Sequence, residues 1–449
     1  GPVTIDNNKI DQIKNGQVGS LLNTIGSERT RSWQKLAMQS RLKIPLLFGQ
    51  DVIHGFKTTF PIPLAEAASW DLPAIQMSAR VAATEASASG IHWTFAPMVD
   101  IARDPRWGRV MEGAGEDPYL GSLISAARVK GFQGTHLGDT NTLMACVKHF
   151  AAYGAAVGGR DYNSVDMSER QLWEIYLPPF KAAVDAGAAS FMNSFNDING
   201  IPAVANNYLQ RTILKGNWGF KGFVVSDWGS IGELINHGYA KDAKEAALLS
   251  MNAGTDMDME SRAYKNNLTQ LVKEGKRILI KKFEMGLFDD PYKFSNNERE
   301  AAALNNPAHI AAARSMAAKS IVLLKNNDNI LPLSKNLKKI AFVGPLVKSL
   351  LQNKGFWDVS IPTVDSNFIV SQWEGLQDKV GPGTSLLYAK GCEIEGDNKS
   401  GFSEAVAVAN QADVVILSIG EKRDMSGEAK SRSNINIPGV QEELLQALL

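Results

Sequence analysis

The sequence predicts an α/β protein, with a (β/α)8 TIM-type barrel first and a second α/β domain after it. Three observations lead to this prediction. Strand-like apolar runs alternate with amphipathic helical stretches through the first 288 residues, which is the rhythm of a parallel sheet. Nearly every apolar run ends in a polar residue. The 449 residues are also too many for one ordinary domain.

The strands of the first domain are expected where short apolar runs occur between turn or helix patterns. These runs cover residues 44–51, 92–100, 143–150, 188–196, 222–228 and 253–259. Amphipathic stretches between them, such as 73–88 and 168–187, predict helices. The second stretch begins with Ser168, a favourable N-cap residue, followed three positions later by Gln171.

Polar side chains follow these strands at the point where each strand ends. They are Asp51, Asp100, Lys148, His149, Asn196, Asp227 and Asp256. The carboxyl ends of barrel strands meet on one face, and that face holds the active site. An open doubly wound sheet would also bring strand ends together. However, no G-x-G-x-x-G motif follows the first strand, and the length of the segment suits a barrel better.

A polar stretch separates the two predicted domains. We expect a catalytic barrel over residues 1–288, a linker over 289–315 and a second domain over 316–449. In the second domain, residues 338–345 and 412–421 read as strands, and 402–411 read as a helix.

Composition excludes several classes of protein. The 47 basic and 47 acidic residues balance, which gives no support to nucleic-acid binding or to an anionic membrane surface. Cys146 and Cys392 are too far apart for a CxxC site, and two cysteines make no disulfide scaffold. No apolar run approaches the ~20 residues that span a bilayer. The first residues contain no signal-peptide core, so any export signal has been removed or was never present.

The stretch GFVVSDWGSI, residues 222–231, places a carboxylate directly after a buried strand. Asp227 could act as a nucleophile, with the indole of Trp228 available to stack on a sugar or another ring. Asp is also a favoured helix N-cap, and a helix could begin at this point. The residues of this stretch leave both interpretations open.

Cationic and donor side chains near other strand ends are further candidates. Lys148 and His149 could bind hydroxyls or neutralise a carboxylate, or they could be a solvent-facing lysine and a structural histidine. In the loop 103–118, Arg109 could reach hydroxyls through its guanidinium fork. The other charged residues of this loop are expected to brace it: Arg103, Arg106, Glu112 and Asp117.

Two polar loops complete the candidate set. The Gly-rich loop at 158–163 suits a backbone that passes close to a ligand. The loop 420–439 offers Glu421 and Glu428. We find no G-x-S-x-G elbow and no H-E-x-x-H zinc motif, so neither a metal nor a cofactor is expected. A barrel mouth rich in carboxylates and aromatic rings suits glycoside hydrolysis, which needs two carboxylates around the scissile bond.

Several motifs in one order resemble glycoside hydrolase family 3, and in particular its bacterial periplasmic β-glucosidases. They are FAPMVDIARDPRWGR (95–109), KHF (148–150), SFNDINGIPA (194–203) and GFVVSDW (222–228). The resemblance implies a (β/α)8-type barrel followed by an α/β sandwich domain, with the site between them. It further implies a retaining, exo-acting β-glucosidase that is periplasmic or secreted and binds a small-molecule carbohydrate.

The resemblance also assigns roles to residues. Asp227 matches the family's nucleophile, Trp228 matches an aromatic on the leaving-group side, and Glu428 best matches the general acid/base, with Glu421 as its rival. The residues that match the sugar-binding positions are Asp51, Arg109, Lys148 and His149. Retention needs the two carboxyl groups about 5–5.5 Å apart. We expect Arg109, Lys148 or His149 to lower the pKa of the nucleophile and keep it ionised.

Some features depart from the family pattern. Phe195, among the residues matched to the substrate-binding set, stands where many members have a tyrosine, so the hydroxyl contact to the nucleophile is not expected here. The chain looks shorter than the family near Gly275–Lys276 and near Asn353–Asp365. It also lacks the family's C-terminal β-sandwich after Leu449, so it reads as truncated or gapped.

Several alternatives stay open at this point. A β-xylosidase of the same family differs by one hydroxymethyl group in its substrate, which these motifs do not resolve. A catalytically silent sugar-binding protein on the same fold is another. An N-acetylglucosaminidase is disfavoured because Phe150 is not followed by the PGHG of that branch. The sequence leaves the oligomeric state open, a homodimer included.

Overall fold

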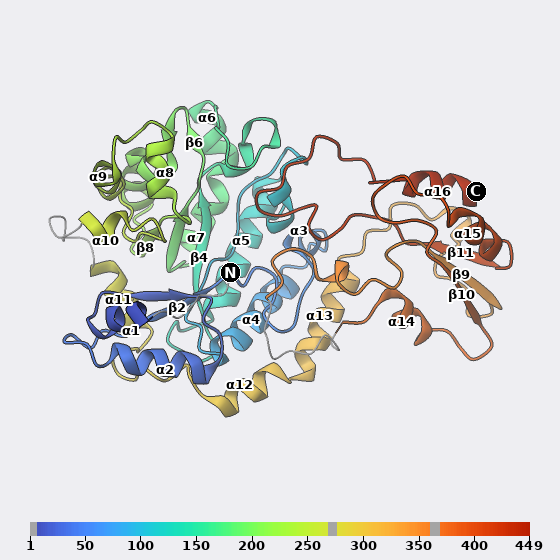
Figure 1. Cartoon of the computed structure of the whole chain (residues 1–449), viewed down its shortest axis with the longest axis horizontal. Helices are drawn as coiled ribbons and strands as arrows, with labels where there is room; N and C mark the ends of the chain where they lie inside the picture. Colours follow the sequence, from blue (N-terminus) through green and yellow to red (C-terminus); the bar gives the residue numbers. More distant parts are fainter. Residues whose placement is uncertain (1–6, 268–275, 360–368) are drawn as a thin grey trace. The chain divides into compact units, whose positions relative to one another are not determined.

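The protein folds into two compact units, seen here in a computed structural model that describes residues 7–267, 276–359 and 369–449 (Figure 1). Unit 1 comprises Gly1–Ile321 together with two short later segments, Trp357–Ile361 and Gly427–Ser431. Unit 2 comprises Val322–Phe356, Pro362–Ser426 and Arg432–Leu449. Part of the loop expected to lie in the second domain therefore belongs to unit 1.

Unit 1 is built on a parallel sheet, which confirms the predicted α/β class. The strand order is β1-β2-β3-β4-β5-β8, and neighbouring strands are parallel throughout. The strands are β1 (Ser20–Leu22), β2 (Leu47–Gln50), β3 (Trp93–Thr94), β4 (Met144–Phe150), β5 (Ser190–Asn193) and β8 (Phe223–Val225). A small antiparallel pair, β6 (Asp197–Ile198) and β7 (Ile201–Pro202), lies beyond β5.

Within the described residues this sheet has six strands. The sequence analysis did not predict β1, and the strand expected at 253–259 does not form. Of residues 253–259, only Met257 pairs with the sheet, in a single bridge to Val225. The backbone N–H groups of Asp256 and Met257 both donate to the carbonyl of Val224, and the carboxylate of Asp256 accepts from the N–H of Val224. A side chain thus replaces the backbone partner that a regular ladder would use.

The strand expected at 92–100 is interrupted in the same way. Only Trp93–Thr94 forms a strand, and Met98 returns to the sheet as one parallel bridge to Lys148. Pro97 lies between these two pairings and has no N–H to donate to a ladder.

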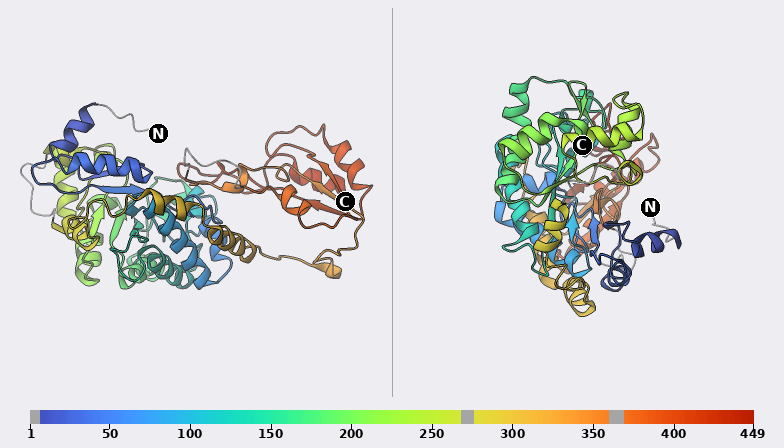
Figure 2. Two further views of the ribbon diagram at one scale, coloured as in Figure 1. Left: turned by 90° about the horizontal axis from the view of Figure 1, so that it is seen from below. Right: turned by 90° about the vertical axis from the view of Figure 1, so that its left-hand side faces the viewer.

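Helices cover the sheet of unit 1 on its outer side (Figures 1 and 2). Among them, α5 packs against both α4 and α7. The helices are α1 (Asn7–Lys14), α2 (Ser27–Ala37), α3 (Pro63–Ala67), α4 (Leu72–Ala88), α5 (Pro118–Gln133), α6 (Glu169–Gln171), α7 (Pro178–Asp185), α8 (Ser230–Asn236), α9 (Ala243–Ala253), α10 (Ala263–Asn267), α11 (Lys276–Glu284), α12 (Asn297–Leu304) and α13 (Pro307–Lys319). Two π-helices, Leu172–Tyr176 and Tyr208–Asn217, and several short 3-10 helices are also present.

Both faces of the sheet are buried, which explains why the strands read as continuous apolar runs. Alternate strand residues pack in two different clusters. Leu47, Met144 and Phe223 belong to the cluster inside the sheet's curve, whereas Phe48 and Val224 belong to the cluster under the helices. With its faces occupied by packing, the sheet offers polar groups only at its strand ends.

The stretch 289–315, which was expected to be a linker, is largely helical. Residues 289–315 contain α12 and most of α13, and both helices belong to unit 1. His309 of α13 is hydrogen-bonded through Nδ1 to the buried Glu85 of α4 at 2.8 Å. The contacts of α13 therefore place the boundary between the units after Ile321.

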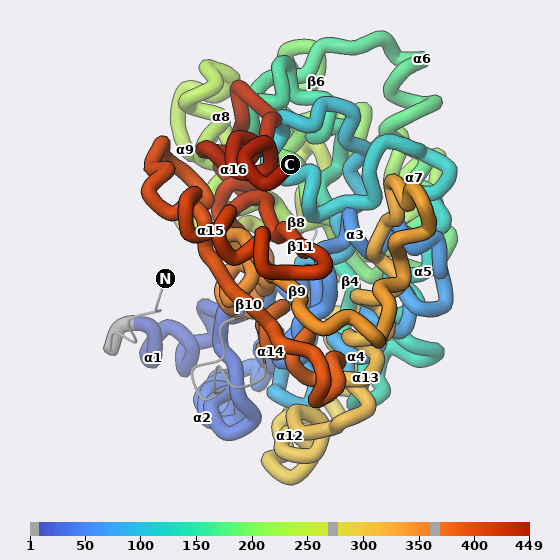
Figure 3. Tube along the Cα trace, turned by 90° about the vertical axis from the view of Figure 1, so that its right-hand side faces the viewer, coloured from blue at the N-terminus to red at the C-terminus, as the bar shows by residue number. Residues whose placement is uncertain are grey.

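Unit 2 is a second parallel α/β layer (Figure 3). Its strand order is β10-β9-β11, so the first strand in sequence lies in the middle. Helix α15 packs against β9, β10 and α16. The elements are β9 (Lys339–Val343), α14 (Gln372–Gln377), β10 (Ser385–Ala389), α15 (Phe402–Ala409), β11 (Val414–Leu417) and α16 (Gln441–Leu448).

Two places where the sequence looked shorter than the family fall on residues that the structure does not describe. The places where residues were expected to be missing, near Gly275–Lys276 and near Asn353–Asp365, overlap the undescribed ranges 268–275 and 360–368. In the described part of the chain, no helix is both long and apolar enough to span a membrane.

Candidate active site

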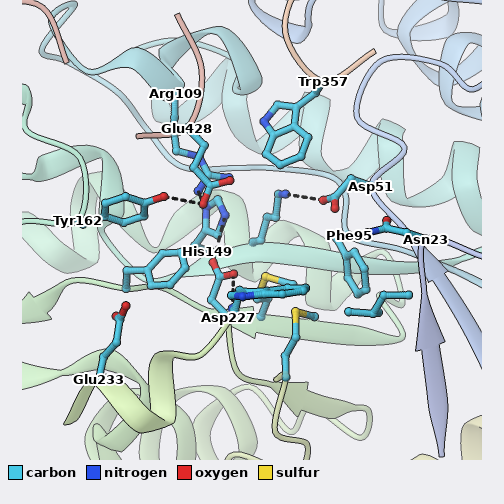
Figure 4. A pocket seen from close by; sticks show the side chains of 16 residues that line it. Asn23, Asp51, Phe95, Arg109, His149, Tyr162, Asp227, Glu233, Trp357 and Glu428 are labelled. Carbon is cyan, nitrogen blue, oxygen red and sulfur yellow. Dashed lines mark hydrogen bonds and ion pairs between the residues drawn. The ribbon is translucent and has the colours of Figure 1, made fainter. Parts of the chain in front are cut away.

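A pocket of about 420 Å³ opens at the carboxyl ends of the unit 1 strands (Figure 4). Its volume lies within the usual range for small-molecule sites. The sequence-predicted residues that line it are Asp51, Arg109, Lys148, His149, Phe195, Asp227, Trp228 and Glu428. The structure thus brings the whole predicted set together within unit 1.

Asp227 follows β8 and is buried, with 8% of its surface exposed. Its Oδ1 accepts a hydrogen bond from the N–H of Trp228 at 2.7 Å, and its Oδ2 lies 3.7 Å from Nε2 of His149. The next helix, α8, has Gly229 as its N-cap, and no side chain caps it. The helix-cap interpretation of Asp227 is therefore wrong, and the carboxylate faces the pocket.

The pKa of Asp227 is raised to about 7. Burial is the main cause, and the negative charge of Glu428 adds to it, while Arg109, Lys148 and the N–H of Trp228 act in the opposite direction. We expected the neighbouring cations to hold this pKa low. That expectation was wrong because the cost of burying the charge exceeds the attraction of two cations that already pair with other carboxylates.

His149 contributes no positive charge to this balance. Burial, followed by the charges of Arg109 and Lys148, lowers the pKa of His149 well below its ordinary value. Its Nδ1 is hydrogen-bonded to Oδ2 of Asp100 at 2.8 Å, and its backbone N–H donates to the same oxygen at 2.9 Å. Asp100 therefore fixes the orientation of a neutral imidazole whose Nε2 faces Asp227.

Lys148 pairs with Asp51, which lies on the opposite side of the pocket from Tyr162 (Figure 4). Its ammonium donates a hydrogen bond to Oδ1 of Asp51 at 3.2 Å and lies 5.5 Å from the ring centre of Trp357. Burial lowers the pKa of Lys148, but the carboxylates of Asp51 and Glu112 outweigh that effect and raise it overall. The lysine is therefore charged and oriented before any ligand arrives.

Arg109 is the buried cation at the centre of the site. Its Nε and Nη2 donate to the two carboxylate oxygens of Glu112 at 2.8 and 3.0 Å. Its remaining nitrogen, Nη1, lies 3.5 Å from Oε1 of Glu428. Tyr162 donates a hydrogen bond from its hydroxyl to the same Oε1 at 2.8 Å. Two groups of the barrel thus converge on one oxygen of Glu428.

The segment that carries Glu428 is tied to the barrel by its backbone. The N–H of Gly427 donates to the carbonyl of Gly108 at 2.7 Å, and the N–H of Gly108 donates to the carbonyl of Lys430 at 2.9 Å. Glu421, the rival candidate, belongs to unit 2, where its carboxylate is paired with Arg432. Of the two glutamates, Glu428 is therefore the one that lines the pocket.

Aromatic rings form the apolar part of the pocket. Trp228 is 55% exposed and lies next to Asp227. Phe195 is buried and meets the ring of Tyr162 edge-on, with centroids 4.9 Å apart. A ring at position 195 thus contributes packing against Tyr162, and Tyr162 supplies a hydroxyl in this region.

Comparison with known proteins agrees with this geometry. The chain matches the glycosyl hydrolase family 3 N terminal domain over residues 3–285 and the glycosyl hydrolase family 3 C-terminal domain over residues 321–449.

The chain belongs to glycosyl hydrolase family 3.

Similar proteins in this family differ in their described activities. The chain is 42% identical to a periplasmic β-glucosidase of Salmonella typhimurium, over 98% of the chain and 61% of that protein. It is 35% identical to a β-xylosidase of Formosa agariphila, over 95% of the chain and 63% of that protein. The crystal structure of a Listeria innocua β-glucosidase in complex with glucose superimposes with a TM-score of 0.90 at 39% identity, covering 98% of this chain and 63% of that one. The chain therefore spans about three fifths of the length of these relatives.

The charged loop 103–118 of this family 3 chain is braced as predicted. Arg106 pairs with Asp104, Arg109 pairs with Glu112, and Asp117 caps α5 by accepting from the N–H of Leu120. Arg103 donates to the carbonyl of Glu116. These contacts fix the loop on which Arg109 lies.

Sequence reasoning missed several residues of the pocket. Tyr162 lies in the Gly-rich loop that the sequence analysis selected, but its position beside Glu428 follows from a contact across 266 residues. Trp357 comes from a segment that gave no sign of joining the barrel. Asn23 follows β1 and Glu233 lies on α8, and neither was among the predicted site residues. Figure 4 shows these residues around the same opening.

Replacing Asp227 with Asn should stabilise the protein, and more so at higher pH. The pKa of Asp227 is about 7 in the folded protein and ~3.9 in the unfolded chain. Between these pH values the folded protein keeps a proton that the unfolded chain releases, so the free energy of unfolding decreases as the pH rises, until the pH passes about 7. Asn stays neutral, so the expected gain in unfolding free energy has a ceiling of about 4 kcal/mol at pH 8 and about 2 kcal/mol at pH 5. Urea unfolding at both pH values measures it.

The exposed Asp185 of α7, which pairs with Lys181, provides the control. Asp185→Asn should give no gain that grows with pH. An Asp227→Asn gain that is equal at pH 5 and pH 8 would contradict the raised pKa.

Proposed function

We propose that this protein is a retaining, exo-acting β-glucosidase that hydrolyses terminal non-reducing β-D-glucosyl residues of β-glucosides and short β-gluco-oligosaccharides. One observation carries the proposal. Two carboxylates, Asp227 and Glu428, line a single pocket beside Arg109, one of them buried after a barrel strand and the other held on a docked loop. Glycoside hydrolysis requires two carboxyl groups that flank the scissile bond in one pocket.

Asp227 is the proposed nucleophile. Its Oδ2 is buried and has no hydrogen-bond partner among the described residues, and Asp227 lines the pocket. This oxygen would attack the anomeric carbon as the bond to the leaving oxygen breaks. The attack requires the ionised form. With a pKa of about 7, the fraction of ionised Asp227 in the free protein rises through neutral pH. When the substrate displaces water from the pocket, the attraction of Arg109 and Lys148 must therefore stabilise the negative charge of Asp227.

Glu428 is the proposed general acid and base. In the first step it donates a proton to the leaving oxygen, and in the second it takes a proton from the water that releases the sugar from Asp227. Its contacts with Arg109 and Tyr162 both fall on Oε1, which leaves Oε2 for the substrate. About a quarter of its side chain is exposed, as a group that exchanges protons with solvent requires.

The remaining polar groups suit binding of a sugar's hydroxyls. Asp51 and Lys148 form a preoriented acceptor and donor pair, and Nε2 of His149 faces the nucleophile. Trp228, being exposed beside Asp227, suits the leaving-group side, where an indole face can stack on a second ring. Phe195 would contribute shape to the pocket without a hydroxyl.

A second candidate is a β-xylosidase, since a relative with that name shares 35% identity with the chain. The greater identity, 42%, to a periplasmic β-glucosidase and the superposition on a β-glucosidase structure with glucose favour the glucoside. By the same resemblance we propose the periplasm as the location.

A 2-deoxy-2-fluoro-β-glucoside with an activated leaving group should label Asp227. The fluorine slows hydrolysis of the glycosyl-enzyme, so intact mass should increase by one fluoroglucosyl residue and peptide mapping should place it at residues 222–231. Asp227→Ala should remain unlabelled. Turnover of an aryl β-glucoside without any adduct on this peptide would refute the nucleophile assignment.

Glu428→Ala should lose far more activity on a poor leaving group than on a good one. Protonation of the leaving oxygen contributes about 10²–10⁴-fold when that oxygen is basic and little when it is a dinitrophenolate. The measurement is kcat/KM for cellobiose and for 2,4-dinitrophenyl β-glucoside. Glu421→Ala is the matched control and should change neither value by more than about twofold, because an exposed ion pair contributes little. The reverse ranking would move the role to Glu421.

A panel of aryl glycosides should rank the glucoside first. An extra hydroxymethyl group in a fitted pocket changes transition-state binding by about 1–3 kcal/mol, so we expect kcat/KM for the glucoside to exceed that for the xyloside by about 10-fold or more. Galactoside and N-acetylglucosaminide serve as controls. A preference for the xyloside would favour the second candidate.

A further inference from the structure

We infer that Asp161 is the positioning residue for Glu428: it fixes the backbone segment that carries the proposed general acid and base. The inference rests on the proposed function of Glu428 and concerns a residue that itself stays away from the substrate pocket's lining.

Asp161 is 7% exposed, and each of its two carboxylate oxygens accepts a hydrogen bond from a different donor. Oδ1 accepts from the indole N–H of Trp107 at 2.9 Å, and Oδ2 accepts from the backbone N–H of Ala429 at 2.8 Å. Ala429 directly follows Glu428. A buried carboxylate therefore lies one peptide unit from the group that transfers the proton.

The backbone at this point needs outside support. Ala429 has a φ of 58°, in the left-handed region that a residue with a β-carbon disfavours. Residues persist in such conformations when surrounding contacts determine them. The hydrogen bond from Ala429 to Asp161 is such a contact, and it is charge-assisted, which makes it stronger than a neutral one.

Further contacts join the same loops. The backbone N–H of Asp161 donates to the hydroxyl of Ser431 at 2.9 Å, on the other side of Ala429. Tyr162, the next residue, donates to Oε1 of Glu428. The dipeptide Asp161–Tyr162 thus holds both the backbone of the 427–431 segment and the side chain of Glu428.

Trp107 provides the rigid side of this arrangement. Its ring is fully buried and meets the ring of Tyr153 edge-on. It also precedes Gly108, whose backbone is hydrogen-bonded to the 427–431 segment, and Arg109 lies one residue further on. Through Trp107, Asp161 connects the loop after β4 to the loop that carries Arg109, so both partners of Glu428 are positioned together.

A misplaced acid has a distinctive kinetic consequence. A displacement of about 1 Å can cost about 10²-fold in a proton transfer, but it does not affect attack by Asp227 on a substrate whose leaving group needs no proton. A residue that merely stabilised the fold would affect both kinds of substrate alike.

The test compares Asp161→Asn with wild type on cellobiose and on 2,4-dinitrophenyl β-glucoside. The amide keeps the size of the side chain but presents an NH2 group to one of the two donors. We expect kcat/KM for cellobiose to fall about 10²-fold and kcat/KM for the dinitrophenyl substrate to fall less than about threefold. Full labelling of the variant by the 2-fluoroglucoside shows that it is folded with an intact nucleophile.

Two other variants make the comparison specific. Asp185→Asn changes an exposed carboxylate on α7 that pairs with Lys181, away from these loops, and should leave both substrates within about twofold of wild type. Trp107→Phe removes one donor and keeps the hydrogen bond from Ala429, so it should show the same selective loss to a smaller extent.

Equal losses on both substrates, or no loss on either, would overturn the inference. Glu428→Ala serves as the reference that separates it from the proposed function. If Glu428→Ala shows the selective loss and Asp161→Asn does not, Asp161 is not the positioning residue. If Glu428→Ala also fails to show it, the proposed role of Glu428 fails first.

Discussion

The buried guanidinium of Arg109 is the interaction on which the rest of the site depends. It gives two hydrogen bonds to Glu112 and leaves Nη1 turned toward Glu428. A buried arginine is stable only when its charge is matched and its donors are used, and removing one member of such a group leaves an uncompensated charge. Glu112 thus keeps Arg109 in place, and Arg109 in turn receives the carboxylate that the distant loop supplies.

The charge balance around Arg109 explains the protonation of the other groups. Arg109 and Lys148 face four carboxylates: Asp51, Glu112, Asp227 and Glu428. Burial raises the pKa of Asp227 by more than Arg109 and Lys148 lower it, and His149 stays neutral beside them. A pocket with this excess of negative groups suits a reaction in which positive charge develops at the anomeric carbon.

Sequence reasoning predicted the part of the site that depends on local chain geometry. Asp51, Lys148, His149 and Asp227 end parallel strands, and parallel strands bring their carboxyl ends together whatever the intervening helices are. Tyr162, Asp161 and Trp357 were not predictable in this way, because their place is set by contacts with segments far away in the sequence. The raised pKa of Asp227 was missed for a related reason, since burial depends on all the elements around the pocket and not on the charges next to it in sequence. The loss of regular strand pairing at residues 92–100 and 253–259 was missed because a proline and an aspartate side chain changed the hydrogen bonding of otherwise apolar runs.

The docking of residues 427–431 on the barrel also has a consequence for the timing of synthesis. Among the described residues, the last strand of the unit 1 sheet ends at Val225, but Glu428 is added to the chain about 200 residues later. At ~5–20 residues per second, a ribosome needs roughly 10–40 s to cover that interval. During this time the nascent chain already contains Asp227 and the groups around it, but not the second carboxylate. The chain therefore gains its complete pair of carboxylates in one late step, when a short segment made after most of the barrel reaches Asp161 and Gly108.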